Sequence, residues 1–200
     1  MKFIETKLKG TYIIELEPME DERGFFARSF CQKEFKKHGL NFRIVQCNIS
    51  FNKKRGTLRG MHYQVSPYEE AKLVSCIRGA IYDVIIDLRQ DSPTYCQWFA
   101  VELTAHFHSH NHLPDHSLIN PFTHSPMNPS THQLLYIPQG FAHGFQTLED
   151  DSVVFYQMSE FYHSESARGV RWDDKAFGIK WLLSEQIMSK KDISYPDFRR

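Results

Sequence analysis

Hydrophobic residues along this chain gather in short runs that are separated by turn residues. One such turn is formed by Arg78, Gly79 and Ala80. Short runs about 8–12 residues apart with turns between them are typical of an all-β sandwich or barrel. The expected strands are Tyr12–Leu16, Lys72–Ile77, Ile81–Leu88, Trp98–Leu103, Leu134–Ile137, Gly144–Leu148 and Val153–Met158.

Helical patterns are sparse in comparison. Gln32–His38 reads QKEFKKH and is followed by Gly39, which predicts a short helix with a C-terminal glycine. A second short helix is expected over Ser184–Ser189. The fold class predicted from these patterns is therefore all-β, with a few short peripheral helices.

The segment Ala105–His132 differs from the rest of the chain. It holds seven of the eleven histidines and contains no convincing strand. We expect a long loop or lid inserted between two strands, and loops of this length are usually either functional or disordered. His106, His108, His110 and His112 alternate, so they could chelate zinc or nickel, although a solvated loop with only adventitious metal binding is the simpler interpretation. No linker divides the chain, so residues 1–200 are expected to form one domain.

Charge and cysteine content exclude several classes of protein. The formal net charge is zero, from 24 basic and 24 acidic residues, which argues against a nucleic-acid partner. The four cysteines contain no CxxC pair and are interpreted as free thiols in a reducing compartment. The first ten residues are polar and are not followed by an apolar segment, and no run of 18 apolar residues occurs. We therefore expect no signal peptide, no membrane association and a cytoplasmic location.

Two motifs carry candidate chemistry. Pro138–His143 has the PxGxxH spacing of cupin barrels, where the histidine normally binds a metal together with two further histidines and a glutamate. At the place of the HxH and glutamate, this chain has Arg59–Gln64, which reads RGMHYQ and contains the single histidine His62. Because a stable transition-metal site needs three or four ligands, we expect no metal in the barrel, which leaves His62 free to act as a base.

These motifs and others resemble the RmlC family, the dTDP-4-dehydrorhamnose 3,5-epimerases. The matching segments extend nearly from end to end and occur in the family's order and spacing. They are DERGFF (21–26), LRGMHYQ (58–64), AKLVSCIRGAIYDVIIDLR (71–89), DSPTY (91–95), IPQGFAHGFQTL (137–148), residues 156–162, VRWDD (170–174) and SKKD (189–192). The resemblance implies a cupin-type jelly-roll β-barrel that epimerises C3 and C5 of a nucleotide-linked 4-keto-6-deoxy hexose without a cofactor.

The resemblance assigns the proton-transfer residues. His62 matches the base, and Asp192 matches the aspartate that hydrogen-bonds it and stabilises the imidazolium. Tyr156 matches the acid that protonates the opposite face of the enolate, Lys72 the cation that stabilises the C4 oxyanion, and His143 a second donor to the sugar. Taken singly, the same residues could be a core histidine, a surface aspartate or a packed strand tyrosine. A charged lysine inside the barrel would need an anionic partner.

The resemblance also assigns the nucleotide-binding residues and an assembly. Arg23 and Arg59 match diphosphate ligands, whose oxygens suit the bidentate geometry of guanidinium. Tyr162 matches the residue that stacks on thymine, and Gln46 and Asn48 complete this group. The implied assembly is a homodimer with strand exchange, in which the Arg23 region reaches the partner's site.

Three departures from the family pattern concern nucleotide recognition. Arg28, a candidate substrate ligand, occupies a position where some members carry glutamate. Cys47 replaces an aspartate, and Ala167 lies near the position of a base-contacting glutamate. The exact nucleotide and sugar therefore stay open.

Three rival functions also remain. The first is an epimerase or ketoisomerase that acts at a single centre or on another nucleotide-linked 4-keto sugar. The second is a non-catalytic cupin that only binds a sugar nucleotide, and the third is a metal-dependent cupin that uses the histidine-rich loop.

Overall fold

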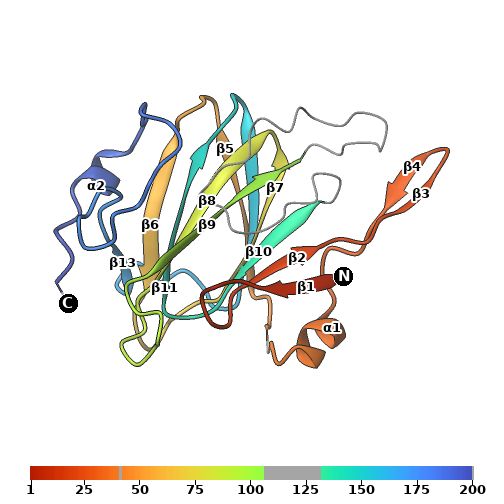
Figure 1. Ribbon diagram of the computed structural model, residues 1–200, viewed down its shortest axis with the longest axis horizontal. Helices are drawn as coiled ribbons and strands as arrows, with labels where there is room; N and C mark the ends of the chain where they lie inside the picture. Colours follow the sequence, from red (N-terminus) through yellow and green to blue (C-terminus); the bar gives the residue numbers. More distant parts are fainter. Residues whose placement is uncertain (41, 106–131, 200) are drawn as a thin grey trace.

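Two antiparallel sheets face each other and form most of this computed structural model, which describes residues 1–40, 42–105 and 132–199 (Figure 1). The six-stranded sheet has the order β1 (Lys2–Glu5), β2 (Tyr12–Glu15), β10 (Gln133–Ile137), β7 (Lys72–Arg78), β12 (Ser152–Met158) and β5 (Gln46–Asn52). The five-stranded sheet has the order β13 (Ala167–Gly169), β6 (Leu58–Gln64), β11 (Phe141–Thr147), β8 (Ala80–Asp87) and β9 (Trp98–Thr104). This arrangement confirms the all-β prediction.

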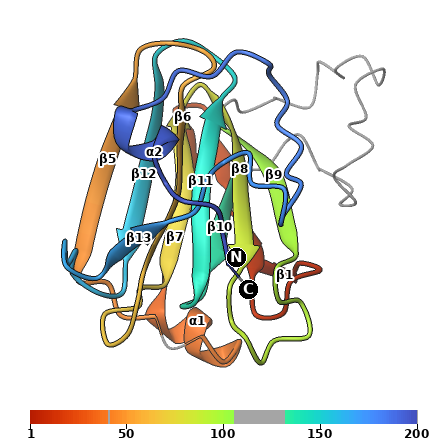
Figure 2. The same cartoon turned by 90° about the vertical axis from the view of Figure 1, so that its left-hand side faces the viewer.

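The hydrophobic core lies between the two sheets. The sequence of strand β8 is strongly apolar because both of its faces are covered. Ile81 and Ile85 point into the core between the sheets, whereas Tyr82, Val84 and Ile86 pack under the C-terminal segment on the outer face. Figure 2 shows this C-terminal segment crossing in front of β11 and β8. The segment is therefore held against the five-stranded sheet by buried apolar contacts.

All seven strands expected from the sequence are present, with ends shifted by a few residues. The expected turn between two of them is also present, since β7 ends at Arg78 and β8 begins at Ala80. Gly79 between them has φ +73°, and a Cβ there would lie 2.6 Å from Oγ of Ser152. Glycine is thus needed both for the backbone conformation and for the close approach of the neighbouring strand.

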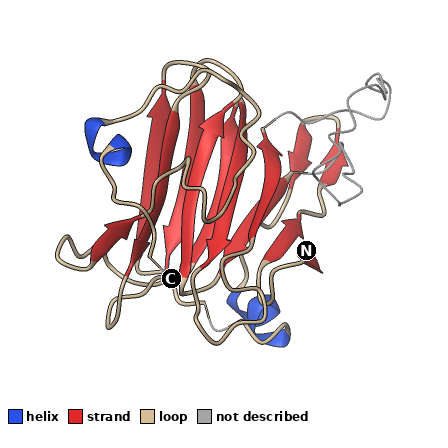
Figure 3. Cartoon of the chain, turned by 60° about the vertical axis from the view of Figure 1, so that its left-hand side comes forward, coloured by secondary structure: helices blue, strands red, loops and turns tan. Residues whose placement is uncertain are grey.

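One predicted helix is confirmed and one is wrong. Helix α1 (Gln32–Lys37) forms as expected and buries Phe35. The helix expected over Ser184–Ser189 is absent, because Ile187 exchanges backbone hydrogen bonds with Gly56 and Leu58 and is therefore extended. The helical turn begins later, as α2 (Lys190–Ile193), with Ser189 as its N-cap. Figure 3 shows the two helices at opposite ends of the strand-rich body.

A hairpin of β3 (Met19–Asp21) and β4 (Gly24–Phe26) projects away from the sheets (Figure 1). Its side chains are exposed, including Met19, Phe25 and Phe26. Within the described residues, none of the helices has the length and apolar character needed to cross a membrane. The histidine-rich loop predicted over 105–132 falls almost entirely outside the described residues, so its proposed roles stay predictions.

Candidate functional site

A cavity of about 790 Å³ opens between the two sheets, where β5, β7 and β12 face β6 and β11. Nine of the predicted site residues line it, although they come from distant parts of the chain. They are Gln46, Asn48, Arg59, His62, Lys72, His143, Tyr156, Tyr162 and Asp192. The volume is that of an ordinary ligand pocket.

His62 and Asp192 form a close pair on one wall. His62 is in β6, and its Nε2 donates to Oδ1 of Asp192 at 2.7 Å. The Asp192 side chain is only 7% exposed, whereas that of His62 is 43% exposed and reaches the cavity. Burial alone would raise the pKa of Asp192, but the hydrogen bond and charge of His62, together with Ser189 and the Gly60 amide, lower it. Asp192 is therefore a carboxylate that can stabilise an imidazolium, and Nδ1 of His62 remains as the nitrogen that can take a proton.

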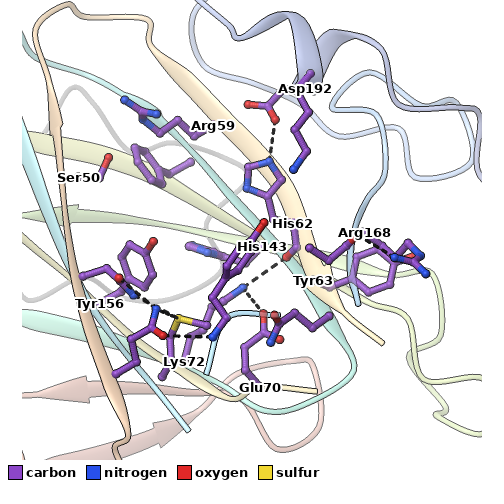
Figure 4. A pocket seen from close by; sticks show the side chains of 18 of the residues that line it. Ser50, Arg59, His62, Tyr63, Glu70, Lys72, His143, Tyr156, Arg168 and Asp192 are labelled. Atoms are coloured by element: carbon purple, nitrogen blue, oxygen red, sulfur yellow. Dashed lines mark hydrogen bonds and ion pairs between the residues drawn. The ribbon is translucent and has the colours of Figure 1, made fainter. Parts of the chain in front are cut away.

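Tyr156 occupies the opposite wall. It is in β12 of the six-stranded sheet, whereas His62 is in the five-stranded sheet, and both line the same cavity (Figure 4). Burial raises the pKa of the Tyr156 phenol, and the charge of Glu70 acts in the same direction, while nearby Arg59 lowers it. The phenol is therefore protonated at neutral pH and can donate a proton to a strong base on its side of the cavity.

Lys72 lies inside the barrel with the anionic partner that such a position requires. Its Nζ is 2.7 Å from Oε1 of Glu70, and the two side chains are 9% and 4% exposed. Nζ also donates to the backbone oxygen of His62 at 3.4 Å. A buried lysine fixed in this way brings a positive charge close to the His62 wall, where it can stabilise a developing oxyanion.

His143 lies directly beside His62, because the two residues are register partners in β11 and β6. Its Nε2 is 2.8 Å from Oδ1 of Asp83, and both side chains are buried. Asp83 did not stand out in the sequence, because it lies within the apolar strand β8. This second histidine can offer a hydrogen bond to a ligand held between His62 and Tyr156.

The rest of the cavity carries different chemistry. Figure 4 shows Arg59 at the end of the cavity away from Lys72 and Glu70. Nε of Arg59 donates to Oδ1 of Asn52 at 2.7 Å, which holds the guanidinium in place. Gln46 lies on the β5 side of the cavity at the level of Lys72, because both are register partners of Met158 in β12. It donates to Asn48 and accepts from the backbone amide of Tyr162, a residue that is 56% exposed. An arginine, two amides and an exposed aromatic ring suit a phosphate-linked planar group.

Arg23 and Arg28 are not brought to this cavity. Arg23 lies at the turn of the β3–β4 hairpin, is 88% exposed and forms an ion pair with Asp21. Arg28 pairs with Glu34 of α1 at 2.7 Å. Both arginines precede β5, and neither lines the cavity of its own chain.

Several lining residues were missed by sequence reasoning. Glu70 precedes Lys72 by two residues, which in an extended segment puts the two on one side, and this spacing was the available signal. Arg168 and Tyr195 gave no signal, because their packing is set by strand β13 and by the C-terminal segment. Lys191 lies within the SKKD motif, next to Asp192.

Across the described ranges, no three or more histidine, cysteine, aspartate and glutamate side chains are grouped so that they could hold a metal ion. The alternating histidines from His106 to His112 lie outside those ranges, so metal binding by this segment stays a prediction.

Comparison with known proteins gives a consistent match. A family model described as dTDP-4-dehydrorhamnose 3,5-epimerase matches residues 5–125 and 117–200. A protein of that name from Shigella flexneri is 37% identical over 199 residues, which cover 99% of this chain and 96% of the relative. The crystal structure of dTDP-4-dehydrorhamnose 3,5-epimerase from Elizabethkingia anophelis NUHP1 has a TM-score of 0.83 at 37% identity, covering 99% of this chain and 96% of that chain.

A second structure of the same name, from Bacillus anthracis str. Ames with TDP and PPi bound, has a TM-score of 0.84 at 36% identity. The match covers 98% of this chain and 99% of that chain. These similarities confirm the predicted cupin-type jelly-roll barrel.

Proposed function

Since this chain belongs to the dTDP-4-dehydrorhamnose 3,5-epimerase family, we propose that it inverts C3 and C5 of dTDP-4-keto-6-deoxyglucose. The product is dTDP-4-keto-rhamnose, in the biosynthesis of rhamnose-type deoxysugars. The observation that supports this mechanism is the position of His62 and Tyr156 on opposing sheets with one cavity between them. Neither epimerisation changes the oxidation state of the sugar, so the proposal assigns no step to a cofactor.

His62 takes the proton in each epimerisation. Both C3 and C5 are next to the C4 carbonyl, so breaking either C–H bond moves its electron pair toward the C4 oxygen and gives an enolate. Nδ1 of His62 forms the new N–H bond, and the resulting imidazolium is stabilised by the carboxylate of Asp192, 2.7 Å from Nε2. Tyr156 then donates its phenolic proton to the same carbon from the opposite face, and solvent restores both groups.

Lys72 and His143 act on the oxygen atoms of the sugar. The negative charge of the enolate is concentrated on the C4 oxygen, and the Lys72 ammonium is the cation that stabilises it. Glu70 fixes this ammonium from the side at 2.7 Å. His143, the register partner of His62, donates a further hydrogen bond to the sugar. The sugar therefore lies at the Lys72 end of the cavity.

The nucleotide lies along the β5 side of the cavity, between the level of Gln46 and Arg59. Arg59 binds the diphosphate, Gln46 and Asn48 contact the nucleoside, and the exposed ring of Tyr162 stacks on the base. Stacking is tolerant of base identity, whereas hydrogen bonds at the base edge discriminate between bases. Thymine is the base that family membership favours for this chain.

The working unit is a homodimer of two single-domain chains, 1–200, with shared sites. Strand β5 is one of the two edge strands of the six-stranded sheet and exposes Ile49 at 68% and Phe51 at 48%. The projecting β3–β4 hairpin exposes Met19 and Phe26 at 65% and 66%. The exposed apolar hairpin of one chain is suited to pair with the exposed apolar edge strand of its partner by strand addition. Exchange of the hairpins would carry Arg23, and Arg28 after it, toward the partner's diphosphate.

The protein is expected to act in the cytoplasm. Its four cysteines are free thiols in the structure. Thiols of this kind remain reduced in that compartment.

The test is solvent exchange during turnover. Protein is incubated with dTDP-4-keto-6-deoxyglucose in D₂O, and deuterium at C3 and C5 is followed by NMR together with product formation. We expect deuterium at both carbons and formation of dTDP-4-keto-rhamnose. Deuterium at one carbon only would replace the double epimerase by the single-centre enzyme, and tight binding without exchange would replace it by a binding protein. Activity of the untagged protein that is lost on chelation and restored by zinc or nickel would favour the metal-dependent rival.

A further inference from the structure

The C-terminal segment places an aromatic ring beside the proposed base. After α2 the chain returns across β13, and the ring of Tyr195 packs flat against Gly169. A Cβ at position 169 would lie 2.3 Å from Cε2 and Cζ of this ring, well inside the distance that any real side chain tolerates. The φ of Gly169 lies outside the left-handed region, unlike that of Gly79. Glycine is therefore needed at 169 for the ring and not for the backbone.

Gly169 is the register partner of His62 across β13 and β6. The ring that covers it therefore lies next to the imidazole, and the two ring centroids are 6.0 Å apart with an interplanar angle of 68°. Tyr195 also lines the cavity. The imidazole is thus held at Nε2 by Asp192 and flanked by the Tyr195 ring, in an edge-to-face geometry that stabilises aromatic pairs.

Asp192 and Tyr195 are three residues apart, so one short segment delivers both contacts. Helix α2 has four residues and makes few backbone hydrogen bonds of its own. Its N-cap, Ser189, fixes the start of the turn, and the Tyr195 ring on Gly169 fixes the chain just after it. Burial raises the pKa of the Tyr195 phenol, and the charge of Lys191, together with a hydrogen bond from it, acts in the opposite direction. The ring therefore anchors the C-terminal segment beside His62, and its hydroxyl faces Lys191 of α2.

We propose that Tyr195, seated on Gly169, is a positioning residue that holds the His62–Asp192 pair in the geometry needed for proton abstraction. This inference rests on the proposed epimerase function. The ring acts by fixing the orientation of the imidazole and the buried position of the Asp192 side chain. The phenolic hydroxyl is not required. Since a displacement of about 1 Å in a reacting group can cost about 100-fold in rate, loss of the anchor should appear in kcat rather than in binding.

The test compares Y195A, Y195F, G169A and the double variant G169A/Y195A in the full-length protein. Steady-state kcat and KM are measured on dTDP-4-keto-6-deoxyglucose, with deuterium exchange at C5 as the direct readout of proton abstraction. Ile193→Ala is the matched control, because Ile193 lies between Asp192 and Tyr195 but is 57% exposed and outside the cavity. Thermal unfolding of each variant separates loss of the fold from loss of positioning.

We expect Y195A and G169A each to lower kcat about 10- to 100-fold, with KM changed less than about threefold. Y195F should keep at least about a third of the wild-type kcat, because it keeps the ring. The double variant should resemble Y195A alone, since the added methyl group meets no ring once Tyr195 is gone.

Wild-type kcat in folded Y195A, a loss confined to KM, or multiplying effects in the double variant would each overturn the positioning role. If Y195A fails to fold, G169A and Y195F still decide the matter, because a G169A protein with normal kcat also overturns it. Absence of exchange in the wild-type protein would instead refute the proposed epimerase function.

Discussion

Replacing Asp192 by asparagine removes the negative charge next to the base, His62, and leaves the surrounding backbone in place. The cap of α2 is kept, because Ser189 accepts from the backbone amide of residue 192 and not from its side chain. Asparagine can still accept a hydrogen bond from Nε2 of His62, but it offers no charge to the imidazolium that forms when the proton is taken. The substitution therefore isolates the electrostatic contribution of the pair.

The size of the effect follows from the burial and geometry of the pair. A hydrogen bond to a charged group contributes about 1.5–3 kcal/mol. The 2.7 Å contact and the 7% exposure of Asp192 favour the upper part of this range, whereas the 43% exposure of His62 allows solvent screening. A loss of about 2 kcal/mol corresponds to about a 30-fold decrease in kcat.

The assay is kcat and the rate of deuterium exchange at C5 for D192N and for the wild-type protein at pH 7.5. D173N is the matched control, because it removes the same charge from a side chain that is 40% exposed and outside the cavity. A decrease in kcat of less than about threefold in D192N would refute the claim that Asp192 stabilises the protonated base.

Three further predictions follow from buried charges and from the shared site. D87N should lower the free energy of unfolding by about 3 kcal/mol in urea denaturation, because the Asp87 carboxylate is fully buried. Burial alone would raise the pKa of this carboxylate, but its hydrogen bonds with Arg89, Ser92 and Thr94 lower it. This difference should be complete above about pH 4, the ordinary carboxyl range, and should shrink as the pH falls through the lowered pKa; a difference that grows in acid would contradict it. K72M should lower kcat at least about 100-fold with a smaller change in KM, and an unchanged kcat would exclude Lys72 from oxyanion stabilisation. Mixing and re-equilibrating the inactive variants R23A and H62A should restore about a quarter of the wild-type activity, because each mixed dimer has one intact site, whereas no recovery would refute a site shared between chains.

Much of the fold could be predicted from the sequence because long, buried strands carry a strong local signal. Strand β8 is buried on both faces, so its apolar run is almost continuous and its ends are marked by turns. The three-residue strands of the β3–β4 hairpin carry no such signal, since all their side chains are exposed and their pairing is their main stabilisation. The region Ser184–Ser189 was assigned wrongly because its backbone pairs with Gly56–Leu58, a contact that no local pattern indicates.

Residues of the candidate site could be predicted where they lie within a recognisable motif. His62 and Asp192 are 130 positions apart, yet the RGMHYQ and SKKD motifs pointed to both. Glu70 and Tyr195 required the structure, because the first is defined by its ion pair with Lys72 and the second by a seat on Gly169. Contacts between strands and the returning C-terminal segment depend on the three-dimensional path of the chain, which local sequence patterns do not encode.

The most direct test of the central claim separates proton removal from proton delivery. H62A and Y156F are incubated with dTDP-4-keto-6-deoxyglucose in D₂O, and deuterium at C5 and C3 is measured by NMR beside the epimerised product. H62A should lose both exchange and product. Y156F should still exchange, within about tenfold of the wild-type rate, while product formation falls at least about 100-fold. Exchange that persists in H62A, or that disappears in Y156F as completely as in H62A, would contradict a base and an acid acting on opposite faces of one sugar.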